Sequence, residues 1–249
     1  MAYSKSMSDN YVWSLPYLPL TFNSIVEVGS RDALDAIFLS EFFDCEVVSF
    51  EPNPLQIEVC KENIVKSGRS SIKLRTEALS NENATIDFFV VDTTLYDNSG
   101  ASGLFLIDFS NRPKNDPDRG HAPIQIPVRV KALRWDSLGL STPELLVMDC
   151  EGAELAVLEG FGEEIKKVRF IVLEVNQVAI GEGACTFKQI DKFLRKSNFE
   201  FVASRNFMDR YYYLKIRLFA SSFKKRIRKP FGKTQRGLLF DVVYRNARE

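Results

Sequence analysis

The chain has no long apolar run, no cluster of cysteines and only one histidine. No segment of its 249 residues approaches the ~20 consecutive apolar residues that span a bilayer. Met1 to Asn10 lacks the basic and apolar blocks of a secretory signal. The four cysteines are widely scattered, without the spacing of metal ligands. We therefore expect a soluble, cytoplasmic protein with reduced thiols and no cysteine-based metal site.

A strand, a turn, a helix and a second strand are predicted between Ile25 and Pro54, as in half of a nucleotide-binding fold. Branched apolar residues before Gly29 suit a strand covered on both faces, and Gly29 permits the sharp turn that follows. The helix after this turn has an apolar face formed by Leu34, Ile37, Phe38 and Phe42. The second strand leads to Glu51, where open α/β sheets place an acid that accepts both ribose hydroxyls. The stretch predicts a nucleoside site, although a carboxylate at a strand end can also be merely solvated.

The loop from Gly29 to Leu34 contains a single glycine. A nicotinamide dinucleotide loop normally reads G-x-G-x-x-G, which lets the backbone approach the pyrophosphate. A nicotinamide-dependent reductase is therefore a disfavoured alternative. Because Asp32 lies inside the loop, the sequence favours a ligand that carries an ammonium group, such as S-adenosylmethionine.

A second strand, acidic turn and helix are predicted between Leu145 and Gly160. Asp149 and Glu151 follow the strand, at the edge of the sheet where ligands lie. They could instead cap the helix that follows. Glu154 falls in the first helical turn, where a negative charge favours the helix dipole, so we expect it to stabilise the helix rather than to act in catalysis.

Six segments stand in a characteristic order: Val26 to Gly29, Phe50 to Pro54, Glu77 to Ser80, Gly100 to Leu104, Trp135 to Leu138 and Asp149 to Leu155. In order and spacing this set resembles the FkbM family of S-adenosylmethionine-dependent methyltransferases, over roughly Ser24 to Asn176. The resemblance implies a class I methyltransferase fold. This is an α/β, Rossmann-like, doubly wound and mostly parallel seven-stranded sheet with helices on both faces.

The resemblance also implies a cofactor site. The amino-acid end of S-adenosylmethionine would lie at Glu27 and Gly29, the ribose at Glu51, the adenine edge at Glu77 and Ala78, and the methyl-donating end at Asp149. The loop residues Arg31, Asp32, Pro52 and Asn53 complete the predicted set. The family usually has a G-A-N-x-G turn, which here reads G-S-R-D-A from Gly29, so arginine replaces the usual asparagine.

Strands and helix signals alternate along most of the chain. The further candidate strands are Ile72 to Arg75, Thr85 to Val91, Ile124 to Leu133, Leu145 to Cys150, Val168 to Val175, Phe199 to Ala203 and Leu238 to Tyr244. This alternation predicts one mostly parallel twisted sheet. With 45% hydrophobic and 27% charged residues, we expect a single domain over residues 1–249, with an N-terminal extension at 1–23.

Residues 96–127 are rich in Asn, Asp, Pro, Gly and Ser and predict a long loop. A loop of this length without structure of its own is usually functional or disordered, and here it could form a lid over the acceptor. Its His121 could deprotonate an acceptor hydroxyl near neutral pH, or it could be a solvated loop histidine.

The other candidates for the catalytic base are Asp149, Glu151 and Glu174 at the sheet edge. With Asn176, Asp149 and Glu174 could instead hold a divalent cation, since carboxylate and amide oxygens suit magnesium. We do not favour a metal and predict no metal ligand. The family resemblance implies O-methyl transfer to a hydroxyl of a sugar, a glycan or a secondary metabolite.

A basic insertion is predicted at residues 205–236, before the last strand. Arg210 to Phe240 contains ten basic residues and no acid, which leaves 23 basic against 33 acidic residues elsewhere in a chain of zero net charge. Aromatic residues interleave with the basic ones, so segment 210–236 suits an anionic membrane surface, a charged glycan or a nucleic acid. Two alternatives are a solvated insertion and a non-catalytic binding module with a vestigial cofactor pocket. Peripheral membrane association is compatible with the segment, and the sequence does not predict an oligomeric state.

Overall fold

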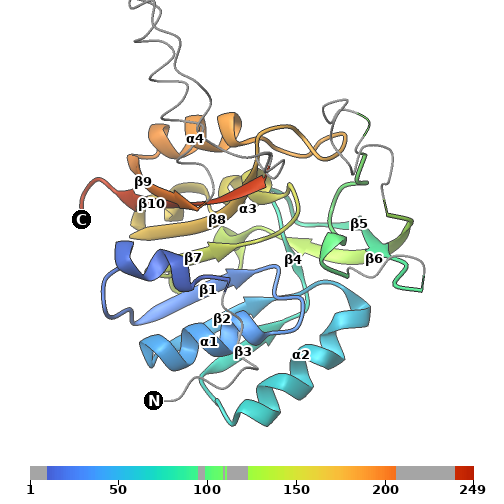
Figure 1. The fold of residues 1–249 in the computed structure, drawn as a ribbon, viewed down its shortest axis with the longest axis horizontal. Coiled ribbons are helices and arrows are strands. Elements are labelled where there is room, and N and C mark those ends of the chain that lie inside the picture. Colours follow the sequence, from blue (N-terminus) through green and yellow to red (C-terminus); the bar gives the residue numbers. More distant parts are fainter. Residues whose placement is uncertain (1–9, 95–98, 109, 111–122, 206–238) are drawn as a thin grey trace, which may run out of the picture.

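The computed structural model describes residues 10–94, 99–108, 110, 123–205 and 239–249, which form two sheets (Figure 1). The large sheet has seven strands in the order β3-β2-β1-β7-β8-β10-β9, and the small sheet has three in the order β4-β6-β5. In the large sheet only β10 runs antiparallel to its neighbours, β8 and β9. The predicted Rossmann-like, mostly parallel sheet is confirmed.

The strands of the large sheet are β1 (Ser24–Val28), β2 (Glu46–Phe50), β3 (Ile72–Arg75), β7 (Leu145–Met148), β8 (Phe170–Asn176), β9 (Phe199–Arg205) and β10 (Leu239–Asn246). The helices are α1 (Leu34–Phe43), α2 (Pro54–Ser67), α3 (Glu154–Gly160) and α4 (Phe187–Lys196), with 3₁₀ turns at Val12–Tyr17, Ser99–Ala101, Trp135–Ser137 and Gly162–Lys167. Within the described ranges, every helix is too short or too polar to cross a lipid bilayer.

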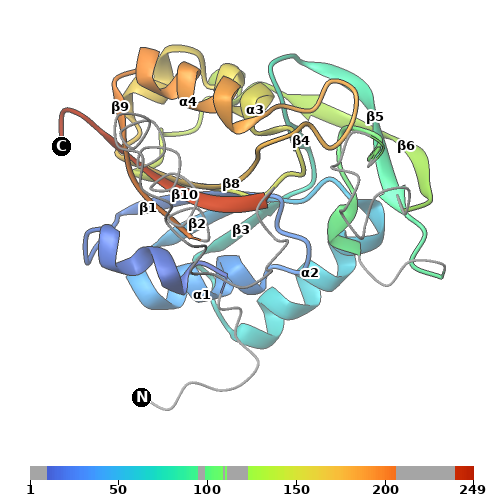
Figure 2. The same cartoon turned by 45° about the horizontal axis from the view of Figure 1, so that its top comes forward.

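Both faces of the large sheet are covered, with α1 and α2 on one side and α3 and α4 on the other (Figure 2). Successive residues of β7 point to opposite faces. Leu145 and Val147 therefore pack in the core beside α1, whereas Leu146 and Met148 pack in the core beside α3 and α4. This double burial explains why β7 is an uninterrupted apolar run.

The small sheet consists of β4 (Ala78–Leu79), β5 (Ala84–Val91) and β6 (Gln125–Leu133). β5 and β6 belong to this separate sheet, so the prediction that Thr85 to Val91 and Ile124 to Leu133 belong to the one parallel sheet is wrong. β5 and β6 pair antiparallel from Ala84 opposite Ala132 to Val91 opposite Gln125. Exposed and covered residues alternate along the first half of β5, as expected of a sheet with one solvated face.

The strand order reverses between β1 and β7, because β2 and β3 follow on one side of β1 while β8 follows on the far side of β7. Open α/β sheets bind ligands at the carboxyl ends of the strands at such a switch point. The turns after β1, β2 and β7 meet there, and they carry Gly29, Glu51 and Asp149.

Candidate functional site

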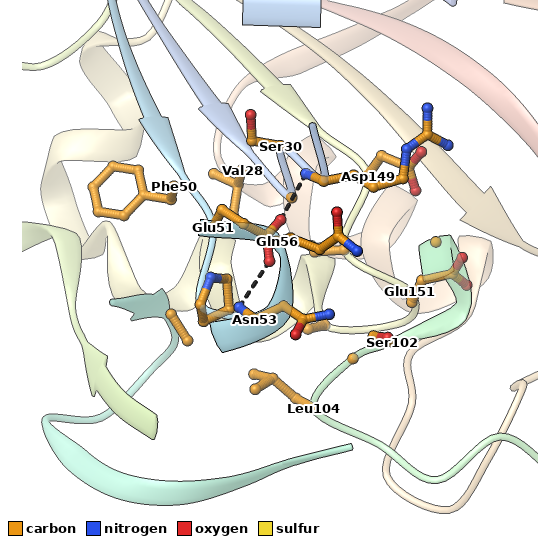
Figure 3. Close-up of a pocket in the computed structure, with 18 of the residues that line it drawn as sticks. Val28, Ser30, Phe50, Glu51, Asn53, Gln56, Ser102, Leu104, Asp149 and Glu151 are labelled. Carbon is orange, nitrogen blue, oxygen red and sulfur yellow. Dashed lines mark hydrogen bonds between the residues drawn. The ribbon is translucent and has the colours of Figure 1, made fainter. Parts of the chain in front are cut away.

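A cavity of about 250 Å³ lies at this switch point (Figure 3). Its walls come from the turns after β1, β2 and β7, from β4 and β5 of the small sheet, and from residues 100–104. Seven of the predicted site residues line it: Gly29, Arg31, Glu51, Pro52, Asn53, Ala78 and Asp149. Glu151 and Glu174, predicted only as catalytic candidates, line it as well.

Gly29 lets the first turn cross the end of β7. Its φ is 88°, and a Cβ at this position would overlap the carbonyl oxygen of Asp149. The N–H groups of Gly29 and Ser30 donate to the carbonyl of Phe50 at 3.0 and 3.2 Å. The turn is therefore fixed against both neighbouring strands, and only glycine fits at its first position.

Glu51 is held by backbone donors on both carboxylate oxygens. It is 4% exposed, and its Oε2 accepts the Arg31 N–H at 2.6 Å while its Oε1 accepts the Asn53 N–H at 2.8 Å (Figure 3). Burial raises the pKa of Glu51, and the two N–H donors oppose that rise. Asn53 in turn caps α2, because its Oδ1 accepts the Leu55 N–H at 3.0 Å. The carboxylate is thus oriented by the backbone, with lone pairs left for a ligand's hydroxyls.

Arg31 is the one basic residue among the described residues that line the cavity. Its backbone is left-handed, with φ of 56°, a conformation that is uncommon outside glycine, asparagine and aspartate. The side chain is 47% exposed and its Nη2 lies 3.3 Å from Oδ2 of Asp32. Unfavourable backbone conformations of this kind cluster at ligand-binding positions.

Three other predicted cofactor residues lie outside the cavity lining. Glu27 is 1% exposed behind the cavity, where its Oε2 accepts the Ser49 hydroxyl at 2.6 Å and burial raises its pKa to about 8. Asp32 Oδ1 accepts the N–H of Leu34, the first residue of α1, at 3.1 Å. Glu77 pairs with Arg75 through two contacts of 3.1 and 2.8 Å. The cofactor contacts predicted for these three residues stay predictions.

Asp149, Glu151 and Glu174 form a carboxylate cluster in which one oxygen of each lies within 4.8 Å of the others. All three are half-buried. Burial first, and then the nearby charge of Glu154, raises the pKa of Asp149 above its usual range. Burial also raises the pKa of Glu174, which faces both Asp149 and Glu151. The raised pKa values of Asp149 and Glu174 favour the protonated forms of these two carboxyls up to a higher pH than in an isolated carboxyl.

Glu154, the first residue of α3, binds the turn that precedes the helix, and α3 has no side-chain cap from Asp149 or Glu151. Glu154 Oε1 accepts the N–H groups of Cys150 and Gly152 at 3.2 Å each, and Cys185 Sγ lies 3.3 Å from Glu154 Oε2. β7 ends at Met148, two residues earlier than predicted, so Asp149 belongs to the turn. This leaves the Asp149 and Glu151 side chains to line the cavity.

The cluster contains two of the residues considered from the sequence for a cation site, Asp149 and Glu174, together with Glu151. Carboxylate oxygens are ligands that magnesium prefers, but grouped acids at a sheet edge are common without a metal. Asn176 is buried in β8 opposite Leu239.

Several lining residues had no predicted role, among them Asn10, Asp35, Gln56, Phe88, Ser102, Leu104 and Leu239. Asn10 donates to Asp35 at 2.9 Å, which ties the segment before β1 to α1. The sequence analysis recognised the Gly100 to Leu104 segment by its family resemblance but predicted no function for it. That resemblance was the sequence signal for the part of the cavity wall that this segment forms. His121 and the basic segment 210–236 lie outside the described residues. Of the predicted insertion at 205–236, the structure describes Arg205 alone.

Comparison with known proteins places the chain in a family. The model of the methyltransferase FkbM domain matches residues 28–201. A 2-O-methyltransferase, NoeI of Sinorhizobium fredii (strain NBRC 101917 / NGR234), is 30% identical over 189 residues, which cover 72% of this chain and 73% of NoeI.

Two solved structures are more distant. The methyltransferase FkbM of Methylobacillus flagellatus KT is 12% identical with a TM-score of 0.44, and the match covers 64% of this chain and 35% of that one. A SAM-dependent methyltransferase of Aquifex aeolicus is 9% identical with a TM-score of 0.48, over 95% of this chain and 89% of that one. The two sequence matches decide the assignment, and the chain belongs to the FkbM family of S-adenosylmethionine-dependent methyltransferases.

Proposed function

We propose that this methyltransferase moves the methyl group of S-adenosylmethionine to a hydroxyl oxygen of a sugar or a secondary metabolite. The observation that carries the proposal is a single cavity that joins the backbone-held Glu51 to the cluster of Asp149, Glu151 and Glu174. The name of the relative NoeI, a 2-O-methyltransferase, supports oxygen as the methyl acceptor.

The charges in the cavity fit this cofactor. Of the described residues that line it, five are acidic, namely Asp35, Glu51, Asp149, Glu151 and Glu174, and one is basic, Arg31; even with Glu174 protonated, the acids outnumber the one guanidinium. S-adenosylmethionine carries an ammonium and a sulfonium but only one carboxylate, and when bound it supplies an electrophilic methyl group. The excess of acids suits the two cationic groups, and Arg31 is the group that would hold the carboxylate.

Other residues would hold the nucleoside. Glu51 accepts the ribose hydroxyls with the lone pairs that its two backbone donors leave free. Ala78, Leu79 and Phe88 supply a mostly buried apolar wall suited to the adenine ring. Glu51 and Arg31 are linked by the Arg31 N–H, so the groups for the ribose and for the carboxylate are fixed relative to each other.

Asp149 is the proposed general base. A raised pKa brings this carboxylate closer to the range in which a base both accepts and releases a proton at neutral pH. Glu174, whose pKa is also raised, would remain protonated and donate a hydrogen bond, and Glu151 would complete the wall that orients the acceptor hydroxyl. Holding the hydroxyl in place supplies most of the rate gain, since positioning turns an encounter of two molecules into a local step.

Calorimetric titration tests the cofactor half of the proposal. The purified chain is titrated with S-adenosylhomocysteine and, in parallel, with NADH. We expect micromolar binding of S-adenosylhomocysteine alone. Binding of NADH, or of neither ligand, would contradict the proposal.

The acceptor half needs a second measurement. Transfer of a radiolabelled methyl group to sugar and metabolite hydroxyls is followed, and the labelled bond is then treated with mild alkali. An ether formed on a hydroxyl oxygen survives this treatment, whereas a methyl ester on a carboxylate is hydrolysed. A label that is lost would exclude O-methylation of a hydroxyl.

A further inference from the structure

A second cavity of about 520 Å³ lies between β5, α3 and the loop before α4. In Figure 1 the small sheet stands beside α3, and the connection between β8 and α4 reaches toward it. The polar rim of the second cavity includes Asn81, Glu82, Asp87 and Glu159. Two half-buried rings, Phe89 and Phe105, form part of the cavity wall. None of these six residues lines the first cavity.

The two cavities share a partition. Leu104 lines both, and neighbouring residues of β5 divide between them, with Phe88 on the first cavity and Phe89 on the second. Phe89 and Gly103 exchange two backbone hydrogen bonds, of 2.8 and 3.1 Å, which fix the partition to the edge of β5. A Cβ at Gly103 would lie 3.2 Å from the Cβ of Glu151, so the second cavity borders the first beside the carboxylate cluster.

Part of the wall of the second cavity is closely packed. Gly152 has φ of 90°, and a Cβ there would lie 2.7 Å from the Cβ of Ala184. Gly183 has φ of 85°, and a Cβ there would lie 2.8 Å from the ring of Phe105. The turn after β7 and the loop after β8 thus approach each other closely, and the Phe105 ring rests directly on that loop. A preformed wall lowers the entropic cost of binding.

The chemistry of this wall selects a class of ligand. Glu82, Asp87 and Glu159 offer carboxylate acceptors, and Asn81, which donates to Glu159 at 2.9 Å, adds an amide. Among the described residues that line the cavity there is no lysine or arginine. From outside it, Arg129 pairs with Asp87 at 3.1 Å, and Arg134 donates to the carbonyls of Asn81 and Glu159 at 2.8 and 3.4 Å. Such a rim accepts hydrogen bonds from hydroxyl groups and repels carboxylates and phosphates. The two phenyl rings suit the apolar C–H faces of a pyranose.

We propose that the second cavity binds a neutral oligosaccharide, namely the part of the acceptor that lies beyond the methylated residue. The proposal rests on the proposed function, because it takes the acceptor hydroxyl to lie at the carboxylate cluster. The proposal narrows the class of acceptor from a sugar or a secondary metabolite to an uncharged glycan of more than one residue.

The test measures binding to the full chain loaded with S-adenosylhomocysteine. An array of short neutral oligosaccharides, the corresponding monosaccharides and uronic-acid oligosaccharides is probed, and the neutral oligosaccharide retained most strongly is then titrated by calorimetry. We expect neutral oligosaccharides to be retained and those with uronic acids to be lost. The double variant Glu82→Ala with Asp87→Ala should weaken that affinity about tenfold, because it removes two charged acceptors.

Two further variants keep the result interpretable. Phe89→Ala, which leaves the backbone pairing to Gly103 in place, should weaken the same oligosaccharide about tenfold with no change in S-adenosylhomocysteine affinity. Glu58→Ala, on the exposed face of α2, should change neither affinity. Two outcomes would overturn this inference alone. In the first, the chain binds S-adenosylhomocysteine but retains no neutral oligosaccharide. In the second, the Glu82 and Asp87 double variant and the Phe89 variant bind the oligosaccharide with unchanged affinity. Failure to bind S-adenosylhomocysteine would overturn the proposed function and this inference with it.

Discussion

The two ends of the first cavity both carry carboxylates, but their surroundings differ. At the Glu51 end, a single acid has a backbone N–H donor on each oxygen, and both donors favour its charged form. At the Asp149 end, three acids lie within 4.8 Å of one another, and after burial the charges of Asp149 and Glu151 help to raise the pKa of Glu174. The first arrangement fixes a charge in place for binding, whereas the second holds protons that can be moved. We therefore expect changes at the Glu51 end to alter affinity and changes at the Asp149 end to alter turnover.

Glu51→Ala should have the largest effect. It removes the acceptor of two ribose hydrogen bonds, and each bond to a charged group contributes about 1.5–3 kcal/mol. We expect the affinity for S-adenosylhomocysteine, measured by calorimetry, to fall about a thousandfold. The variant also leaves the Arg31 and Asn53 N–H groups without their acceptor, so circular dichroism must first show that it is folded.

Two variants control the Glu51 experiment. Glu51→Gln keeps one carbonyl acceptor and should lie between the wild type and Glu51→Ala. Glu58→Ala changes an exposed acid that pairs with Lys61 on the same helix and should bind as the wild type does. A Glu51→Ala protein that is folded and binds with unchanged affinity would remove the ribose assignment.

Asp149→Asn should act mainly on turnover. The amide has nearly the shape of the carboxylate but cannot take up a proton, and loss of a general base typically costs about a hundredfold or more in rate. In the wild type, turnover should rise with pH through the raised pKa of Asp149, because the base works only when ionised. In Asp149→Asn this rise should disappear, and the affinity for S-adenosylhomocysteine should change by less than about threefold. A loss confined to affinity would reverse the roles of the two ends.

The sequence predicted those parts of the first cavity whose residues lie close together along the chain or follow from the order of strands. β1, the Gly29 turn, β2 and Glu51 lie within one short stretch, so apolar pattern and turn chemistry were enough to predict their arrangement. Asp149 was predicted in the same way from the strand that precedes it. The approach of Glu174 to Asp149 depends on β7 and β8 being neighbours, which the order of elements in a doubly wound fold supplied.

The small sheet could not be predicted in this way. Its strands β5 and β6 have apolar residues that suit any sheet, and a long connection separates them, so no local signal fixes which strand each one pairs with. Phe88, Phe89 and Leu104 reach the two cavities only through that pairing. The backbone conformation of Arg31 was equally hidden, because arginine gives no sequence signal for a left-handed residue.

Arg31→Ala should have a smaller effect at the binding end than Glu51→Ala. Its guanidinium is about half exposed, so solvent screens it, and we expect the affinity for S-adenosylhomocysteine to fall about tenfold. The affinity for 5′-methylthioadenosine, which lacks the amino-acid part, should not change. Arg31→Lys keeps the charge without the planar fork and should fall in between. Equal losses of affinity for both ligands would show that Arg31 acts by positioning Glu51 and not by binding the carboxylate of the cofactor.

Glu174→Gln should have the smallest effect and is the sharpest test of the carboxylate cluster. If burial and the neighbouring acids keep Glu174 protonated at neutral pH, its carboxyl group is neutral and donates one hydrogen bond. Glutamine has nearly the same shape, is also neutral and also donates. Turnover at neutral pH should then stay within about threefold of the wild type, while Asp149→Asn in the same assay loses about a hundredfold. A loss in Glu174→Gln as large as that in Asp149→Asn would mean that Glu174 works as a charged group, and the proton would have to reside on Asp149 or Glu151 instead.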